Sequence, residues 1–220
     1  MSSVGGDGGG RHPSKAMFHV KHEGWASHVR ALGIRLSQEQ GVQLERFASL
    51  LLERAIPLGM IASTDAERLW ERHLTDSLRA AVIVRPTEST AYDLGSGAGL
   101  PGIPVAIACP RLEVRLVEPR RKRAAFLELA TSDLWLSNVC VLAERSETLR
   151  DRVDLCFARA FGSPRASWEA ADPLLSAAGR LVYFAGERFD PASLPTGVAV
   201  DIRPPLSLAR SGPLVIMTRQ

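Results

Sequence analysis

Apolar residues recur along this chain with two different periods, and the change falls near residue 86. Between residues 37 and 83 they return every three or four positions, as they do on one face of an amphipathic helix. After residue 90 short apolar runs alternate with helical stretches, a pattern typical of a parallel sheet whose strands are joined by helices. The sequence therefore predicts a small helical region followed by an α/β domain.

Two amphipathic helices are expected in the helical region. The first begins at a capping box, Ser37–Gln40, and is stopped by Pro57 and Gly59. Its inward positions are expected to be Leu44, Phe47, Leu51 and Ala55. A second capping box, Thr64–Glu67, is expected to open the other helix. The inward positions of that helix are expected to be Leu69, Leu74, Leu78 and Val82.

Seven strands are expected to form a mostly parallel sheet in the α/β region. They are expected at 91–94, 112–117, 139–143, 153–158, 180–185, 197–202 and 213–218, with helices near 101–109, 120–136 and 164–177. Helical crossovers require parallel neighbours, whereas the last two strands have no helix between them and should pair antiparallel. The expected division is a disordered tail at 1–16, a helical appendage at 17–85 and the α/β domain at 86–220.

The composition is that of a globular protein, with 45% apolar and 23% charged residues among 220. A formal net charge of +3 permits a nucleic-acid partner without requiring one. No run approaches the ~18 apolar residues of a membrane span, so a cytoplasmic protein is expected. Free, buried thiols are expected at Cys109, Cys140 and Cys156, which have no C-x-x-C spacing. No metal is expected at His19, His22 and His28, which are interpreted as part of a surface segment.

A glycine-rich loop follows the first expected strand and carries the strongest functional signal. The strand ends at Asp93 and Leu94, and Gly95, Gly97 and Gly99 follow at every second position. Glycine tolerates positive φ and lets a ligand approach the backbone, while the next helix offers free N–H groups to a polar or anionic ligand. The loop is therefore expected to bind a nucleotide-like ligand.

Two classes of ligand fit such a loop. Residues 97–102 match the dinucleotide fingerprint G-x-G-x-x-G, but in that fingerprint the first glycine directly follows the strand. The register that fits the strand end starts at Asp93, which is the pattern of class I S-adenosylmethionine methyltransferases. Glu118 follows the second strand and could accept both ribose hydroxyl protons. A nicotinamide enzyme would also need a substrate domain, for which little chain remains, so the methyl donor is favoured.

Cationic and aromatic residues gather after other strands, and therefore at the same edge of the sheet. The run Arg120, Arg121, Lys122 and Arg123 opens a helix, where cations oppose the helix dipole, so a phosphate-contacting role is favoured over a solvated turn. Arg145 follows the third strand, and Arg159 and Phe161 follow the fourth, where they could pair with phosphate and stack on a base. The alternative is a salt-bridged arginine and a core phenylalanine. His73, in the segment 71–78, either anchors the helical region to the sheet or lines the site.

Taken together, these blocks resemble the glucose-inhibited division protein B family, the small-subunit rRNA methyltransferase G family. The blocks are Arg72-His-x-x-Asp-Ser-Leu78, Asp93 to Pro104, Lys122-Arg123-x-x-Phe-Leu127, Arg145-Ser-Glu147 and Arg159-Ala-Phe161. The resemblance implies S-adenosyl-L-methionine as donor and S-adenosyl-L-homocysteine as product. It places the donor on Gly95, Leu100, Glu118, Ser146, Glu147 and Arg159. One departure is Gly59-Met60-Ile61, where family members commonly carry Asn-Leu-Thr.

The reaction implied by the resemblance is methylation of guanine N7 in a decoding-region loop of 16S rRNA, as free RNA or in a small-subunit particle, by a monomer. N7 carries a free lone pair, so no general base is needed, and Arg159 is expected to position the reactants. A methyltransferase for exocyclic amines would typically show Asn/Asp-Pro-Pro-aromatic where this chain has Ala158 to Phe161. A cytosine-C5 enzyme would need a cysteine beyond the strand that contains Cys156. The alternatives are another RNA or a small molecule as acceptor, an NAD(P)-binding oxidoreductase, or a non-catalytic nucleotide-binding module.

Overall fold

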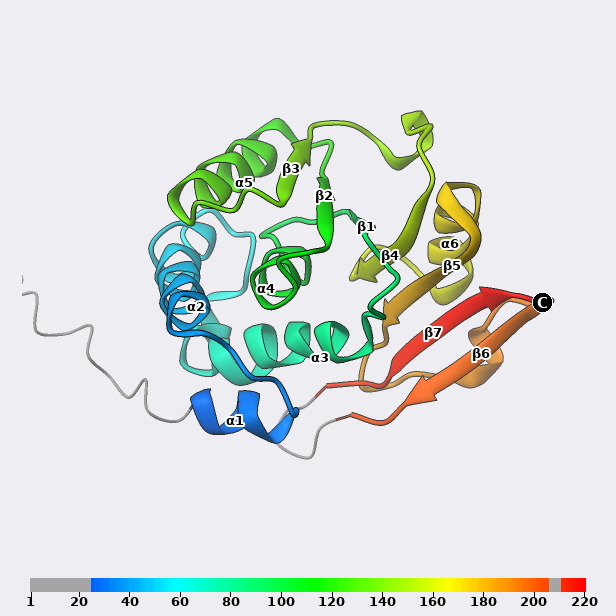
Figure 1. Ribbon diagram of the computed structural model, residues 1–220, viewed down its shortest axis with the longest axis horizontal. Coiled ribbons are helices and arrows are strands. Elements are labelled where there is room, and N and C mark those ends of the chain that lie inside the picture. The colour runs from blue at the N-terminus through cyan, green and yellow to red at the C-terminus, as the bar shows by residue number, and fades with distance from the viewer. Residues whose placement is uncertain (1–24, 206–210) are drawn as a thin grey trace, which may run out of the picture.

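A computed structural model describes residues 25–205 and 211–220, and it contains one mixed sheet (Figure 1). Seven strands lie in the order β3-β2-β1-β4-β5-β7-β6. β1 to β5 run parallel, and β7 pairs antiparallel with both β5 and β6, as predicted. The strands are β1 (Thr90–Leu94), β2 (Glu113–Val117), β3 (Val139–Leu142), β4 (Val153–Arg159), β5 (Leu175–Phe184), β6 (Val198–Arg203) and β7 (Leu214–Arg219).

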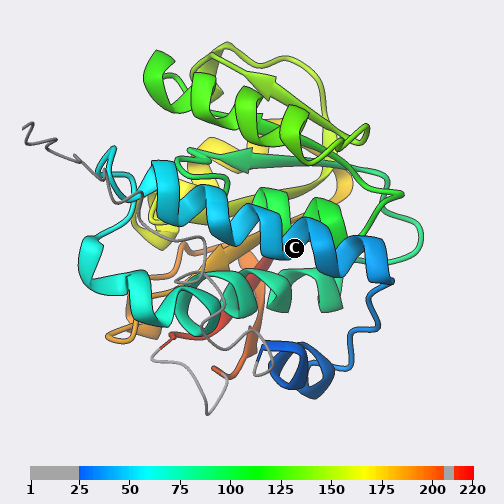
Figure 2. The same cartoon turned by 90° about the vertical axis from the view of Figure 1, so that its left-hand side faces the viewer.

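Helices cover both faces of this sheet. On one face α4 (Gly102–Ala108) and α5 (Arg121–Asp133) pack on strand residues such as Leu116 and Phe157, and α2 (Gln38–Leu50) and α3 (Asp76–Ile83) pack on α4. Figure 2 shows α2 and α3 in front of the sheet. On the other face α6 (Pro164–Ala171) covers the alternate strand positions, among them Cys156 and Ala158. Neighbouring positions of β4 serve opposite cores, so the run Leu155–Ala158 is apolar and fully buried.

The first part of the helical region forms as predicted. Ser37 Oγ accepts a hydrogen bond from Gln40 N at 3.2 Å, and Ser37 N donates to Gln40 Oε1 at 2.8 Å, which closes the capping box of α2. The helix continues through a π-helical turn, η2 (Leu51–Ala55), and all four predicted inward residues are buried. α1 (Trp25–Ala31) docks beside it, with Trp25 stacked on Trp70 at a centroid distance of 4.8 Å.

The second predicted helix is divided into three segments, and its predicted capping box is wrong. A 3-10 helix, η3 (Ser63–Arg68), starts after Ala62 with no side-chain cap, and a π-helix, η4 (Trp70–Thr75), leads into α3. Because η3 begins at Ser63, Thr64 lies inside this helix rather than at its N-cap, so the predicted box cannot form. The neighbouring Asp65 carboxylate lies within 3.3 Å of Arg72 and 3.0 Å of His73.

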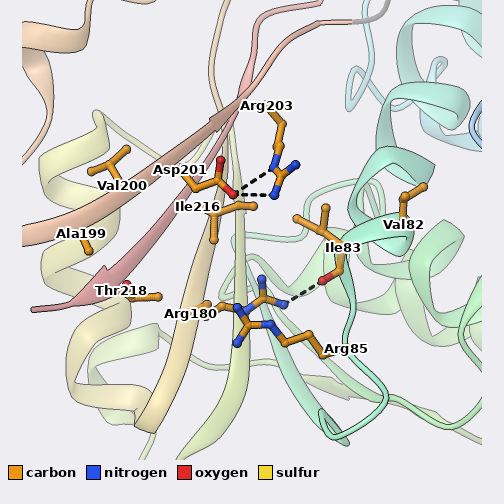
Figure 3. Close-up of a pocket in the computed structure, with 10 residues that line it drawn as sticks. All are labelled: Val82, Ile83, Arg85, Arg180, Ala199, Val200, Asp201, Arg203, Ile216 and Thr218. Carbon is orange, nitrogen blue, oxygen red and sulfur yellow. Dashed lines mark hydrogen bonds and ion pairs between the residues drawn. The ribbon is translucent and has the colours of Figure 1, made fainter.

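The outward position of Val82 is a further correction. Its side chain is 52% exposed, although Leu78 one turn earlier is fully buried. The last turn of α3 extends beyond the core to a cavity of about 440 Å³ between α3 and the β6–β7 hairpin (Figure 3). Ile216 lines the hairpin side of that cavity, and Arg180 crosses its floor to donate to Ile83 O at 2.8 Å.

Two predictions fail on the other face and at the sheet edge. The helix predicted at 164–177 ends at Ala171, and a 3-10 turn, η6 (Asp172–Leu174), leads directly into β5. Pro173 has no N–H to donate to the carbonyl four residues earlier, so the α-helical hydrogen-bond series cannot continue through it. Cys140 is exposed rather than buried because β3 is an edge strand and only the 3-10 turn η5 (Ser146–Thr148) lies between β3 and β4. The predicted tail at 1–16, His19 and His22 lie outside the described residues.

The end of α5 departs from the usual chemistry of a helix C-terminus. Leu136 N donates to Thr131 O at 3.1 Å and Trp135 N donates to Ser132 O at 3.2 Å, which is the Schellman pattern. The position with left-handed geometry usually holds glycine, but here it holds Trp135, with φ of 54° and a side chain that is 89% exposed. This helix end therefore stores backbone strain without burying the indole in return.

Candidate functional site

The glycine loop after β1 has left-handed geometry at three positions. The φ angles are 67° at Gly95, 56° at Gly97 and 83° at Gly99. A Cβ at Gly99 would lie 2.5 Å from Ile103 Cδ1, so this glycine is required by packing inside the loop. A Cβ at Gly97 would meet no atom closer than 3.8 Å. Gly97 is therefore the position where the loop leaves room on its outer side.

Two buried carboxylates hold this loop. Glu118 is 3% exposed and accepts from Gly97 N at 3.1 Å and from Arg120 N at 2.9 Å, so it joins the loops after β1 and β2. Asp93 lies beneath the loop, where its Oδ2 accepts from Gly102 N at 3.1 Å and its Oδ1 is buried without a hydrogen-bond partner. Burial raises the pKa of Asp93 to about 7.

A small cavity opens beside the glycine loop, at the carboxyl ends of four strands, and it is called the donor-side cavity below. Its volume is about 90 Å³. The loops after β1, β2, β3 and β4 all contribute to its lining, which consists of Gly95, Val117, Pro119, Arg145, Ser146, Glu147 and Phe161. The Phe161 ring covers Gly95 so closely that a Cβ there would lie 2.8 Å from Cδ2. Five predicted site residues are thus brought together: Gly95, Arg145, Ser146, Glu147 and Phe161.

Arg159 ends β4 and binds the helical region. Its Nη2 donates to Arg72 O at 2.9 Å and lies 3.2 Å from His73 Nδ1, and its Nη1 donates to Ser77 Oγ at 3.2 Å. Asp76 Oδ2 lies 3.6 Å from the same guanidinium. Arg159 is therefore a tie between β4 and the segment 72–77.

His73 completes this tie as a neutral side chain. Burial, followed by the nearby Arg159 guanidinium, lowers the pKa of His73. Its Nδ1 faces an arginine donor, so the proton sits on Nε2, which lies 3.0 Å from Asp65 Oδ2. The sequence allows two roles for His73, namely anchoring the helical region to the sheet or lining the site. Its contacts show that it anchors.

A larger cavity, called the acceptor-side cavity below, lies on the other side of the loop after β4. Its volume is about 580 Å³. It is formed by the carboxyl ends of β4 and β5, the start of α3 and the segment before β7. Its lining includes Arg72, Asp76, Arg159, Ala160, Tyr183, Phe184, Glu187, Arg188 and Gly212. Residues 183–188 were missed by sequence reasoning because no motif marks them. Their place after a parallel strand was the available signal.

The two cavities are separated by three consecutive residues. Arg159 and Ala160 line the acceptor-side cavity, and Phe161 lines the donor-side cavity. The chain turns between them at Ala160, whose φ of 52° is unusual for a residue other than glycine. The turn Arg159–Phe161 therefore forms part of the wall between the two cavities.

The remaining predicted residues occupy different places. Gly99 and Leu100 support the loop from inside and line neither cavity. Arg120, Arg121 and Lys122 are exposed where α5 begins, and Arg123 Nη1 lies 3.9 Å from Glu118 Oε2. In the described part of the chain no group of three potential metal ligands occurs. Among the described residues, no helix is long and apolar enough to cross a bilayer.

This strand order, with an antiparallel β7, a glycine loop after β1 and an acid after β2, defines the class I methyltransferase fold. Solved structures share it. A Corynebacterium glutamicum protein aligns with a TM-score of 0.53 and 21% identity over 79% of this chain and 89% of its own. Aeropyrum pernix fibrillarin, crystallised with natively bound S-adenosyl-L-methionine, aligns with a TM-score of 0.51 and 16% identity over 66% of this chain and 74% of its own.

Within this class the chain belongs to the GidB family, described as rRNA small subunit methyltransferase G, whose profile matches residues 40–191. The protein of that name from Wolinella succinogenes is 37% identical over 78% of this chain and 86% of its own length. Its namesake from Mycobacterium leprae is 36% identical over 78% and 76%, respectively. The namesake from Sorangium cellulosum is 39% identical over 61% of this chain, but the match spans only 56% of that relative.

Proposed function

We propose that this protein transfers a methyl group from S-adenosyl-L-methionine to N7 of a guanine in the decoding-region loop of 16S rRNA. The observation that carries the proposal is the pair of cavities on either side of the turn Arg159–Phe161. One cavity is joined to the glycine loop, and the other has room for a base. The family's description as an rRNA small subunit methyltransferase supports the choice of acceptor.

The residues around the glycine loop fit the methyl donor. Gly97 leaves open space outside the loop, and each oxygen of Glu118 accepts only one backbone hydrogen bond, so both can still accept from ribose hydroxyls. We infer that Ser146 and Glu147 lie along the adenine, and that Gly95 and Gly97 approach the amino-acid part. Asp93 supports the loop from beneath, where its Oδ2 accepts from Gly102 N at 3.1 Å. The donor contributes an electrophilic methyl carbon bonded to a positively charged sulfur.

The chemistry requires alignment rather than proton transfer. The N7 lone pair forms the new bond to the methyl carbon, the carbon–sulfur bond breaks, and its electron pair stays on sulfur. No proton is lost, so the site needs no general base. We infer that Arg159 acts by fixing the turn between the cavities, because its donors are held by Arg72, His73 and Ser77. Holding reactants in line can contribute several kcal/mol to catalysis.

The RNA is proposed to approach over the basic edge. The side chains of Arg120, Arg121 and Lys122 are exposed at the start of α5, and Arg145 is exposed beside the donor-side cavity. When such cations bind phosphates, the affinity of the complex falls as the salt concentration rises. We further infer that the protein acts in the cytoplasm as a monomer on rRNA or a small-subunit particle, and that residues 17–85 and 86–220 are its helical and catalytic parts.

Mass spectrometry of nucleosides tests the proposal directly. Free 16S rRNA and purified small-subunit particles are incubated separately with the enzyme and labelled donor, and 7-methylguanine is the expected product. Arg159→Ala should lower turnover by roughly 10²-fold if the guanidinium fixes the turn, whereas Arg165→Ala, at an exposed position of α6, should not. Label in N2-methylguanine or 5-methylcytosine alone would refute the target atom. Calorimetric titration with NADPH in parallel tests the oxidoreductase alternative.

A further inference from the structure

The acceptor-side cavity holds two carboxylates among three arginines. The arginines are Arg72, Arg159 and Arg188, and the carboxylates are Asp76 and Glu187. Arginines suit an RNA phosphate, but a carboxylate repels one, so each carboxylate needs a separate explanation.

The fold itself accounts for Asp76. Its Oδ1 accepts from Arg79 Nη1 at 2.7 Å, and its Oδ2 lies 3.6 Å from Arg159 Nη2. The Asp76 side chain is only 8% exposed. Arg79 in turn donates to Gly212 O at 2.9 Å, which ties α3 to the segment before β7. Asp76 is thus neutralised by two guanidinium groups and is not available to a ligand.

Glu187 differs in every one of these respects. It is exposed, and among the described residues its carboxylate has neither a hydrogen-bond partner nor an ion pair, although it lines the same cavity. Two backbone hydrogen bonds brace the loop that carries it: Phe189 N donates to Gly186 O at 3.1 Å, and Ala185 N donates to Pro213 O at 3.1 Å. A short turn therefore places a carboxylate without a partner in a cavity whose other carboxylate is already neutralised.

We propose that Glu187 selects guanine at this site by accepting hydrogen bonds from N1–H and the N2 amine. This inference rests on the proposed function. Guanine is the RNA base that carries two adjacent N–H donors on its Watson–Crick edge, and one carboxylate can accept both. N7 lies on the opposite edge of the purine, so this contact leaves it free to meet the methyl group. The carboxylate also stabilises the positive charge that N7 methylation creates on the ring.

The test removes one donor from the base and one charge from the protein. The nucleotide that the wild-type enzyme methylates is first mapped by mass spectrometry, and RNA is then prepared with inosine, which lacks the N2 amine, at that position. A charge-assisted hydrogen bond contributes about 1.5–3 kcal/mol, so the wild type should lose roughly 10- to 150-fold in kcat/KM on inosine. Glu187→Gln should be slower on guanosine and should discriminate against inosine by less than about 3-fold, with unchanged donor affinity. Glu169→Gln, an exposed glutamate on α6, is the matched control and should behave as the wild type.

Each result has a defined meaning. If the wild type makes 7-methylguanine but shows no inosine penalty, or if Glu187→Gln keeps the full penalty, the assignment of Glu187 is wrong and the proposed function stands. If the wild type makes no 7-methylguanine at all, the proposed function itself fails. If Glu187→Gln is too slow to measure, Glu187→Asp replaces it. The shorter carboxylate should retain the penalty at a reduced rate, and its loss would overturn the assignment.

Discussion

The open side of Gly97 makes a quantitative test of the donor loop possible. With φ of 56°, an alanine there would be forced into left-handed geometry, which costs about 1–2 kcal/mol. Its Cβ would clash with nothing, since the nearest atoms are Gly95 O at 3.8 Å and Arg123 Nη1 at 3.9 Å. Domains of this kind are stable by about 5–15 kcal/mol, so Gly97→Ala should fold. The methyl group would, however, occupy the space that the ligand needs.

The matched control is Gly59→Ala. Gly59 has φ of 68°, and a Cβ there would meet no atom within 4 Å, so it carries the same backbone cost outside the glycine loop. Both variants should lower the melting temperature by about 2–4 °C for each kcal/mol lost. In isothermal titration with S-adenosyl-L-methionine, Gly97→Ala should bind at least about 10-fold more weakly, equivalent to about 1.4 kcal/mol, and Gly59→Ala should match the wild type. Equal donor affinities in all three proteins would refute the placement of the donor at this loop.

Three further predictions concern the rest of the molecule. Trp135→Gly should stabilise the protein by about 1 kcal/mol in urea unfolding, because it relieves the left-handed strain at an 89% exposed position; a destabilised variant would mean that the indole makes contacts that offset the strain. Because burial raises the pKa of Asp93 to about 7 from 3.8, the folded state binds a proton that the unfolded state has released. Stability should therefore fall as the pH rises from about 4 to 7, and Asp93→Asn should lack this decline; parallel pH profiles would contradict the assignment. Replacing Arg121 and Lys122 by glutamine should reduce the slope of log K for 16S rRNA binding against log salt by roughly 1.4–1.8 units. Arg111→Gln is the control. An unchanged slope would mean that residues 120–123 form a solvated helix turn without phosphate contacts.

The fold was predictable wherever its signals are local. The capping box at Ser37 and the glycine spacing after Asp93 involve residues within a few positions of each other, so the sequence contains the whole interaction. The capping box at Thr64 failed because the helix begins one residue earlier, at Ser63, which places Thr64 inside it. A four-residue pattern does not show where the preceding chain enters the helix.

The sequence predicted which edge of the sheet carries the candidate site, but it did not predict the side-chain contacts within that site. Parallel strands bring their carboxyl ends to one edge, which is why Gly95, Ser146 and Phe161 meet although 66 positions of chain separate the first and last. Glu187 carries no motif, and its importance depends on Asp76 being neutralised by Arg79, a contact within a helix predicted only for its apolar face. Glu187 is the free carboxylate of the cavity only because Asp76 is paired with Arg79.

The tie between Arg159 and the segment 72–77 joins parts of the chain more than 80 positions apart. Until β4 has formed, the Ser77 hydroxyl and the His73 ring have no guanidinium to bind, so the wall of the acceptor-side cavity is completed only when the helices dock on the sheet. Local opening of those helices would dismantle the cavity first, because the glycine loop is held instead by Asp93 of β1 and Glu118 after β2. On gentle heating or in dilute urea, RNA binding should therefore be lost before methyl-donor binding.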